Sequence, residues 1–331
     1  MNVVLRWLDR GGLLLSLLVL IVVFSLVNSS FLTKATMLDI IDQNAALAIV
    51  AAGLLVVVIS GGLDLSVGAL SAFSGMVMAQ SFAGGMDPML ALVLGILLGC
   101  AVGIAQGFLI SVIGVNSVIV TLAGLIWARG LATAISGGQS VPVDLNLTLN
   151  LTNRHLGWFS NLALVVLAVY ALVAITLRAT KLGRYIYAQG GSRKAARQAG
   201  LPVWRIGVIV FAISGALAGL AGCLEAGRLG VAGPTLSTGL ELDAIAAVIL
   251  GGARLSGGDG VLSRTMVGVV FIATMNSGLS LLGLADPYVY LYKGLIVLLA
   301  LSLEVAARRF VRDEPFEIQT STKPESAEVP L

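Results

Sequence analysis

The sequence RATKLGRYIYAQGGSRKAARQAGLPVWR, residues Arg178–Arg205, determines how this chain is organised. It carries seven of the chain's 20 lysines and arginines and no aspartate or glutamate. Long apolar runs precede and follow it. Cytoplasmic loops of membrane proteins carry an excess of lysine and arginine, so the stretch predicts a large loop on the cytoplasmic side of a membrane.

A short helix is predicted inside this loop. Ser192 is a typical N-cap residue, RKAARQA follows it, Gly200 is a stop signal and Pro202 lies just beyond. A helix of this length is only marginally stable in water on its own. We therefore expect a soluble partner protein to hold it.

The composition is that of a membrane protein with many spans. Of the 331 residues, 58% are hydrophobic and 11% are charged, whereas soluble domains average about 25% charged residues. Forty glycines favour helices that pack closely, and Gly95, Gly99, Gly103 and Gly107 recur every four residues along one apolar run. The net charge of +3 does not suggest a nucleic-acid partner.

Apolar runs long enough to cross a bilayer predict an all-α polytopic membrane protein with about ten transmembrane helices. The third and eighth runs are short or interrupted by glycine, so broken or re-entrant helices are alternatives there. The predicted spans are Leu13–Val27, Ala45–Ser60, Ser66–Phe82, Met89–Ile113, Ser117–Ile135, Asn161–Leu177, Ile206–Leu224, Leu242–Leu255, Val261–Gly283 and Tyr288–Ala306.

The distribution of charge favours cytoplasmic N- and C-termini. With that orientation, fifteen lysines and arginines lie in cytoplasmic segments, three lie outside and two fall within spans, as the positive-inside rule expects. Ten spans divide into two groups of five, and because five is odd, a duplicated half would be inverted. A faint similarity between Gly61–Leu70 and Gly239–Leu250 supports such a 5+5 repeat.

The chain is predicted to form one transmembrane domain over residues 1–311. Within it, residues 136–160 form a periplasmic loop and residues 178–205 form the cytoplasmic loop. Residues 312–331 are rich in glutamate, proline, serine and threonine, a composition typical of a disordered tail.

Asp64 stands in the middle of the apolar stretch Ile59–Ala69, ISGGLDLSVGA. A carboxylate at membrane depth is costly unless it is paired or hydrated. Gly61 and Gly62 allow the backbone to break, and Asp64 and Ser66 can cap the helix that follows. A capped helix start and a place on a translocation path are equally compatible with this pattern, and the two roles can coexist.

Four further charged residues lie in or beside apolar runs. Glu241 and Asp243 follow a glycine near the start of the eighth span, and Arg129 and Lys293 fall within spans. An ionisable residue inside a span usually faces the bundle interior or water, whereas one near a helix end can reach the membrane interface. The second explanation fits Lys293 better, and both explanations stay open for Arg129. Glu241, Asp243 and Arg129 are counted among the candidates for the path.

The sequence offers no catalytic apparatus of its own. The strings at Ser136–Gln139 and Leu255–Asp259 resemble an ATPase signature, but the sequence has no G-x-x-x-x-G-K-[ST] phosphate loop, and we attribute both strings to chance. A single histidine and the lack of an H-E-x-x-H motif give no basis for a metal site. No enzymatic activity and no cofactor are expected.

Three blocks of the sequence resemble the permease subunit of ribose-type sugar ABC importers. They are Ile59–Ala69, Gly183–Leu201 followed by Ser214–Gly222, and Glu241–Gly260. The resemblance extends from about Met37 to Leu303. It implies a bacterial inner-membrane protein with a type II ABC importer-like fold, which forms the pathway for a monosaccharide or a related small polar solute.

The resemblance also implies partners and a coupling site. The partners would be cytoplasmic ATPase subunits, which hydrolyse the ATP, a periplasmic sugar-binding protein, and a second permease copy or a paralogue. The coupling helix would lie at Ser192–Gly200. The residues implied in coupling to the ATPases are Gly183, Arg184, Gly190, Gly191, Ser192, Arg193, Lys194, Ala195, Ala196, Arg197 and Gly200.

Two other functions remain open on the sequence. A secondary transporter or channel that works without an ATPase would need ionisable residues clustered at mid-membrane as a relay, and the sequence contains only scattered ones. A membrane-embedded scaffold without transport is the third possibility. Copurification of an ATPase subunit would separate the three.

Overall fold

The structure is a computed structural model that describes residues 2–155, 159–284, 287–289, 291–299 and 302. Most of these residues are helical. The helices are α1 (Asn2–Val27), α2 (Lys34–Gln43), α3 (Ala45–Ile59), α4 (Val67–Ala83), α5 (Pro88–Phe108), the π-helical turn η1 (Leu109–Ile113), α6 (Ser117–Ser136), α7 (Leu145–Thr152), α8 (Asn161–Ala179), α9 (Lys181–Gly191), α10 (Arg193–Gln198), α11 (Val203–Leu229), α12 (Leu240–Leu250) and α13 (Leu262–Leu281). Short antiparallel strands pair β1 (Val141–Pro142) with β4 (Val231–Ala232) and β2 (Arg154–His155) with β3 (Phe159–Ser160).

Helices lie at the positions of the predicted spans, but they differ in length. Within the described residues, four are long and apolar enough to cross a bilayer, namely α5 with η1, α6, α8 and α11. The pair α2 and α3, bent by 45°, makes a fifth candidate. α4 has 17 residues and α12 has 11, and these are the two spans that the sequence marks as weak. The polytopic helical class is confirmed, and ten spans stay a prediction.

The last part of the chain falls largely outside this description. Residues 287–289 and 291–299 are helical and apolar, and they lie at the start of the tenth predicted span. The rest of that span and the tail predicted over residues 312–331 lie outside the described residues.

α2 is a helix that the search for apolar runs did not predict. The Thr33 hydroxyl caps it by accepting a hydrogen bond from the nitrogen of Thr36. Its sequence, KATMLDIIDQ, mixes charged and apolar residues. A hydropathy search therefore passes over α2, although its cap is a recognisable signal.

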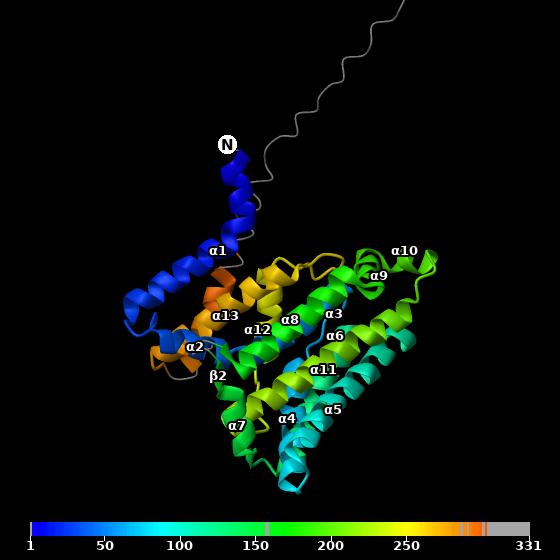
Figure 1. Ribbon diagram of the computed structural model, residues 1–331. Helices are drawn as coiled ribbons and strands as arrows, with labels where there is room; N and C mark the ends of the chain where they lie inside the picture. The colour runs from blue at the N-terminus through cyan, green and yellow to red at the C-terminus, as the bar shows by residue number, and fades with distance from the viewer. Residues whose placement is uncertain (1, 156–158, 285–286, 290, 300–301, 303–331) are drawn as a thin grey trace, which may run out of the picture.

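The closest helix pair in the bundle is formed by α5 and α11, which lie side by side along most of their length (Figure 1). Glycines make this approach possible. A methyl group added at Gly99 would lie 2.3 Å from the carbonyl oxygen of Gly215, and one added at Gly215 would lie 2.2 Å from that of Gly99. The glycines spaced by four along this run therefore serve close helix packing, as the sequence predicts.

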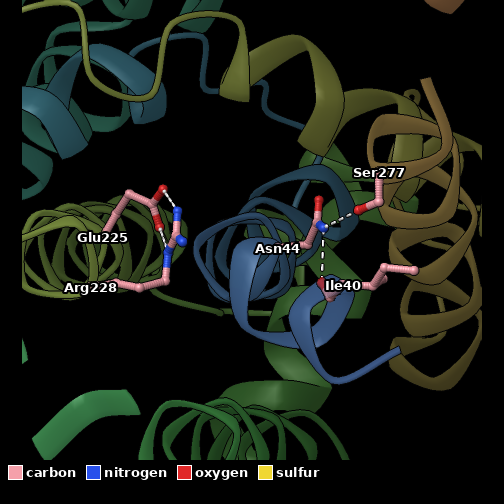
Figure 2. Close-up of polar contacts among 5 residues, drawn as sticks. All are labelled: Ile40, Asn44, Glu225, Arg228 and Ser277. Atoms are coloured by element: carbon pink, nitrogen blue, oxygen red, sulfur yellow. Dashed lines mark hydrogen bonds and ion pairs between the residues drawn. The ribbon is translucent and has the colours of Figure 1, made fainter. Parts of the chain in front are cut away.

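α3 forms the centre of the bundle, because each of its residues is buried. α8, α11, α12 and α13 pack around it. Asn44, at the bend between α2 and α3, donates hydrogen bonds to the carbonyl of Ile40 and to the Ser277 hydroxyl of α13 (Figure 2). Figure 2 also shows the ion pair between Glu225 and Arg228 near the end of α11, with a nitrogen–oxygen distance of 2.7 Å.

The loops between helices gather at two ends of the bundle. One end, which we call the basic end, holds α9 and α10 together with residues 60–62, 114–117 and 256–260 (Figure 1). The opposite end holds α7 and the strand pairs, where β1 meets β4 and Gln80 donates to the carbonyl of Ile135. The longer helices α5, α6, α8 and α11 therefore run alternately between the two ends.

Candidate coupling and translocation sites

The basic stretch folds as two short helices, α9 and α10, at one end of the bundle (Figure 1). The Thr180 hydroxyl caps α9 by accepting from the nitrogen of Gly183, and the Ser192 hydroxyl caps α10 by accepting from the nitrogen of Ala195, both at 3.2 Å. Gly200 follows α10 with a φ of +78°. The predicted helix after Ser192 is confirmed, whereas the sequence analysis missed α9.

The two helices present a positively charged surface. The side chains of all seven basic residues are exposed, namely Arg178, Lys181, Arg184, Arg193, Lys194, Arg197 and Arg205. The residues predicted to couple to an ATPase divide accordingly. Arg184, Gly191, Ser192, Arg193, Lys194, Ala195, Arg197 and Gly200 are exposed, whereas Gly183 and Ala196 are buried and Gly190 is half-buried. The exposed set is available to a partner protein, and the others attach α9 and α10 to the bundle.

Gly183 fixes α9 against the end of α8. A methyl group at this position would lie 2.3 Å from the carbonyl oxygen of Leu177, so only glycine lets the two backbones approach this closely. One turn further along α9, the side chain of Ile186 is fully buried. α9 is therefore packed onto the bundle and does not hang free.

Four glycines, Gly61, Gly190, Gly257 and Gly258, bring three backbone segments together, and we call this contact the glycine junction. A methyl group at Gly190 would lie only 1.8 Å from the carbonyl oxygen of Ile59 and 2.5 Å from the nitrogen of Gly258. The nitrogen of Gly258 donates a 2.9 Å hydrogen bond to that carbonyl. The end of α9 is thereby wedged between the end of α3 and the loop after α12.

Tyr187 adds a side-chain link at the same place. Its hydroxyl donates to the carbonyl oxygen of Gly260 at 2.7 Å. Burial raises the pKa of the Tyr187 phenol, and the negative charge of Asp259 raises it further, while Arg178 opposes the shift. The phenol therefore stays neutral and keeps its proton for this hydrogen bond.

A polar cavity of about 480 Å³ lies beside the glycine junction. Its walls include residues from both predicted sets. From the path candidates come Gly61 and Gly62, and from the coupling candidates come Gly190, Gly191, Ser192 and Arg193. The structure thus brings together two sets that the sequence places more than a hundred residues apart.

Asp64 is fully buried between helices and has its hydrogen bonds satisfied within the subunit. Its Oδ1 accepts from the nitrogen of Ser66 at 3.0 Å and from the Ser66 hydroxyl at 2.6 Å, and its Oδ2 accepts from the Ser214 hydroxyl at 2.8 Å. The Ser66 hydroxyl in turn accepts from Nε2 of Gln106 at 3.0 Å. This network joins α4, α5 and α11, and such satisfied networks stabilise a buried polar group.

The predicted cap at the start of α4 is only partly correct. The Ser66 hydroxyl makes no capping hydrogen bond to α4, because it already donates to Asp64 and accepts from Gln106. The Asp64 carboxylate instead accepts a hydrogen bond from the N–H of Ser66, which immediately precedes the first residue of the helix.

Arg129 holds the segment that leads into α12. Its Nη1 donates to the carbonyl oxygens of Pro234 and Leu236, both at 2.8 Å. Glu241, on the first turn of α12, lies close enough for its charge to interact with Arg129. Arg129 therefore positions a backbone segment, and it does not extend along its helix towards the membrane surface.

Glu241 and Ser237 contribute buried oxygens at the same segment. Among the described residues, neither Oε2 of Glu241 nor the Ser237 hydroxyl has a hydrogen-bond partner. A methyl group at Gly68 would lie 1.9 Å from Oε2 of Glu241, so the Glu241 side chain fits against α4 only because residue 68 is glycine.

Asp243 and Lys293 form an ion pair with a distance of 2.5 Å between Oδ2 and Nζ. Asn276 of α13 donates to the same oxygen at 3.1 Å. The pair borders a groove of about 590 Å³ whose walls are otherwise mostly apolar, with Leu242 and Leu298 among them. Lys293 is therefore paired inside the bundle, which corrects the expectation that it reaches the interface.

Several residues of these sites were not predicted from the sequence. Gln106, Ser214 and Tyr187 act only through contacts with distant segments, so no local pattern marks them. The LSGGD string of Leu255–Asp259 was set aside as chance. Its two glycines belong to the glycine junction, and their clustering was the signal that could have revealed it.

Apolar helices that run between two ends, with a positively charged two-helix element at one of them, define this chain as an integral membrane protein of the transport-permease class. Residues 36–301 match the family described as "Branched-chain amino acid transport system / permease component". The chain belongs to this family, and it is a multi-pass protein of the bacterial inner membrane.

The similar proteins also agree with the motif resemblance. The ribose import permease protein of Escherichia coli (strain K12) is 36% identical over 310 residues, which cover 90% of this chain and 94% of that protein. The ribose import permease protein of Bacillus subtilis (strain 168) is 37% identical over 301 residues, covering 90% and 93%. The L-arabinose ABC transporter permease protein of Azospirillum brasilense is 34% identical over 293 residues, covering 88% and 86%. The resemblance to ribose-type ABC permeases is confirmed.

Proposed function

We propose that this chain is the membrane-spanning subunit of an ATP-driven importer, and that it forms the pathway for a monosaccharide or a related small polar solute. The observation that carries the proposal is the glycine junction. It connects an exposed basic element, suited to a soluble partner, directly to the backbone of the buried central helix α3. A motion imposed on α9 and α10 would therefore reach the middle of the bundle.

The kind of solute is inferred from the relatives. Proteins whose names specify ribose, L-arabinose and D-allose are 32% to 37% identical to this chain over most of its length. The family description names branched-chain amino acids instead, so membership of the family does not by itself select a sugar. The proposal rests on the individual relatives.

The arrangement of the loops supports ten spans with both chain ends in the cytoplasm. The segments that the topology predicts inside are the ones that meet at the basic end, and they come from four separate parts of the sequence. The segments predicted outside, including β1 in the loop 136–160 and β4, meet at the opposite end. The positive charge of α9 and α10 supports a cytoplasmic position for the basic end.

Two short helices support the inverted repeat. α4 is preceded by a non-helical segment that begins with Gly61 at φ +86°, and α12 follows Gly239 at φ +81°. The two helices begin beside each other, where Gly68 of α4 meets Glu241 of α12, and they run from there towards opposite ends of the bundle. The third span of each half is thus a short helix after a glycine break, with the opposite direction, as an inverted 5+5 arrangement requires.

The residues Gly183 to Gly200 form the proposed contact with two cytoplasmic ATPase subunits. The exposed arginines offer hydrogen bonds and charge to acidic side chains of a partner. ATP is hydrolysed on those separate subunits, and this chain converts their closing and opening into movement of its helices. No enzymatic activity is proposed for the chain itself.

The proposed path runs beside α12, between this chain and a second copy or a paralogue. The groove at Asp243 and Lys293 is lined by Leu242 and Leu298, whose side chains are each 63% exposed. Such an apolar face would be covered by a second subunit. Glu241 and Arg129 lie at the start of α12, where this helix meets the start of α4, and solute from the binding protein would pass them on its way through the bundle.

The remaining path candidates lie deeper in the subunit. Gly61 and Gly62 border the cavity at the basic end, whereas Asp64 and Ser66 are enclosed by α4, α5 and α11. We assign Asp64 and Ser66 to the frame that supports the path. The transmembrane domain would comprise residues 1–311, and the loop 136–160 would receive the periplasmic binding protein.

A secondary transporter is the alternative class, and the ion pair of Asp243 with Lys293 beside a groove is the observation that favours it. Ionisable residues within spans can serve as a proton relay in a carrier, but such a carrier does not explain an exposed basic element attached to the central helix. The two classes therefore differ in whether transport needs an ATPase.

The test is reconstitution of the chain with candidate ATPase and binding-protein subunits in proteoliposomes. Uptake of labelled ribose, arabinose or allose that requires ATP and the binding protein supports the importer. Uptake by the chain alone, driven by a proton gradient, would replace it with the secondary transporter. Failure of any ATPase to copurify, together with no uptake under either condition, would favour a scaffold.

A further inference from the structure

The cavity of about 480 Å³ at the basic end has the size of a small-molecule site. It lies where η1, the loop 114–116 and the start of α6 face the end of α3 and the junction of α9 with α10. Most of its described lining is polar or glycine. The polar side chains are Ser60, Ser111, Asn116, Ser117, Gln189, Ser192, Arg193 and Ser256.

The charge of this lining is positive. Arg193 is the one ionisable residue among the described lining residues, and no aspartate or glutamate accompanies it. Within the described part of the chain, its guanidinium makes a long hydrogen bond, 3.5 Å, to the carbonyl oxygen of Ser111 and no ion pair. Its remaining N–H groups are suited to bind the oxygens of a phosphate.

Gln189 lines the same cavity with a buried amide oxygen that lacks a hydrogen-bond partner within the described chain. The residue is 7% exposed, and among the described residues its Oε1 has no hydrogen-bond partner. A buried amide oxygen without a donor is costly, so a bound hydroxyl group would relieve this cost.

Neighbouring side chains supply further hydrogen-bonding groups. Ser117 uses its oxygen to accept from the nitrogen of Leu63, which leaves its hydroxyl proton free to be donated to a ligand. Asn116 accepts a hydrogen bond from Val118 through Oδ1, and its amide N–H groups remain available. This combination of neutral donors and acceptors matches a molecule with several hydroxyl groups.

We propose that this cavity binds a small hydroxylated molecule that carries one phosphate group, the chemistry of a sugar phosphate. Arg193 would hold the phosphate, and Gln189, Asn116 and Ser117 would contact the hydroxyl groups. A phosphoglycerol lipid head group offers the same chemistry from the membrane surface. The ligand would connect the end of α3 to α10 and would restrain movement at the glycine junction.

If the importer proposed above is correct, such binding is a means of feedback. The class of reaction that consumes an imported monosaccharide by phosphorylation would produce a ligand for the cytoplasmic side of its own permease. The feedback role rests on the proposed function, whereas the binding site depends only on the cavity.

The test measures binding to the full-length chain in nanodiscs of phosphatidylcholine alone, by isothermal titration with ribose 5-phosphate, ribose and inorganic phosphate. We expect ribose 5-phosphate to bind at least about tenfold more tightly than either fragment, because a charge-assisted contact and hydroxyl contacts act together. A parallel arm uses nanodiscs that contain phosphatidylglycerol. Competition there identifies the lipid as a source of the same chemistry.

Three variants make the result specific. Arg193→Gln and Gln189→Glu should each weaken binding about tenfold or more, the first by removing the cation and the second by adding a carboxylate near the phosphate. Arg197→Gln is the matched control, because Arg197 lies on the same helix and lines a different pocket. Melting temperatures without ligand show whether each variant is folded.

Ribose 5-phosphate that binds no better than phosphate, with no selective effect of phosphatidylglycerol, would overturn the proposal. Equal loss of binding in Arg193→Gln and Arg197→Gln would also overturn it, because it would indicate general attraction to positive charge. Neither result bears on the importer, whose test is ATP-dependent uptake by the assembled complex.

Discussion

The nitrogen of Gly258 donates a hydrogen bond to the carbonyl oxygen of Ile59, 2.9 Å away, and the Cα of Gly190 fits against both atoms. Residues from three distant parts of the sequence thus share one backbone contact. Because the contact has no side chains, it has no flexible atoms that could absorb a displacement. It connects the basic element directly to the end of the central helix α3.

A side chain at Gly190 should disconnect this contact. In Gly190→Ala the added carbon would lie 1.8 Å from the oxygen of Ile59, so α9 must move away, at a cost of about 1–3 kcal/mol. We expect ATP-dependent uptake to fall at least tenfold while the protein still reaches the membrane. Gly130→Ala is the control, because nothing lies within 4 Å of its added carbon and Gly130 lies outside the proposed ATPase contact. Equal uptake by the two variants would contradict the role of the junction.

Removal of the Asp64 carboxylate should affect stability first. Asp64→Ala leaves the hydroxyls of Ser66 and Ser214 without their buried acceptor, so the free energy of unfolding should fall by about 2 kcal/mol. Thermal unfolding of the purified chain measures the loss, and Asp64→Asn should lose less. Normal thermal stability with abolished transport would instead assign Asp64 to the surface of the path.

The ion pair of Asp243 with Lys293 should be energetically coupled. Asp243→Asn or Lys293→Met alone leaves a charge without its partner at a position that is largely buried, and each should lower stability by about 3 kcal/mol. The double variant should recover a large part of this loss. A double-mutant cycle on the melting temperature tests it, and additive losses would mean that the two charges do not stabilise each other.

Tyr187→Phe should weaken the link to Gly260 without introducing pH dependence. Burial raises the pKa of Tyr187 above its ordinary value of about 10, so the stability from its neutral form is fully present below that value and is lost only as the pH rises beyond it. Between pH 6 and 9, uptake by the variant should be lower by a constant factor. A ratio that changes with pH would show that the phenol titrates.

The orientation of the chain can be tested with single cysteines. In a background without Cys100 and Cys223, Ala195→Cys on α10 should react with a membrane-impermeant maleimide only after the cells are opened. Asn150→Cys on α7 should react in intact cells. Both positions are exposed. Labelling of residue 195 in intact cells would place the basic element outside and would remove the contact with an ATPase.

Local physical chemistry made several features predictable from the sequence. Apolar runs, the charge asymmetry and the cap at Ser192 depend on neighbouring residues, because insertion, orientation and helix capping are decided over short distances. These patterns predicted the helical membrane class, the positions of the longer helices and the short helix α10. The motif blocks added the resemblance to ribose-type permeases, which the related proteins confirm.

Only the tertiary structure decided what the charged and glycine residues do. Asp64 proved to be enclosed by Ser66 and Ser214, Lys293 proved to be paired with Asp243, and the string at Leu255–Asp259 proved to be part of the glycine junction. Each of these facts is a contact between segments far apart in the chain. A sequence pattern shows that a buried charge or an unpaired backbone group would be costly. Packing determines which distant group offsets that cost.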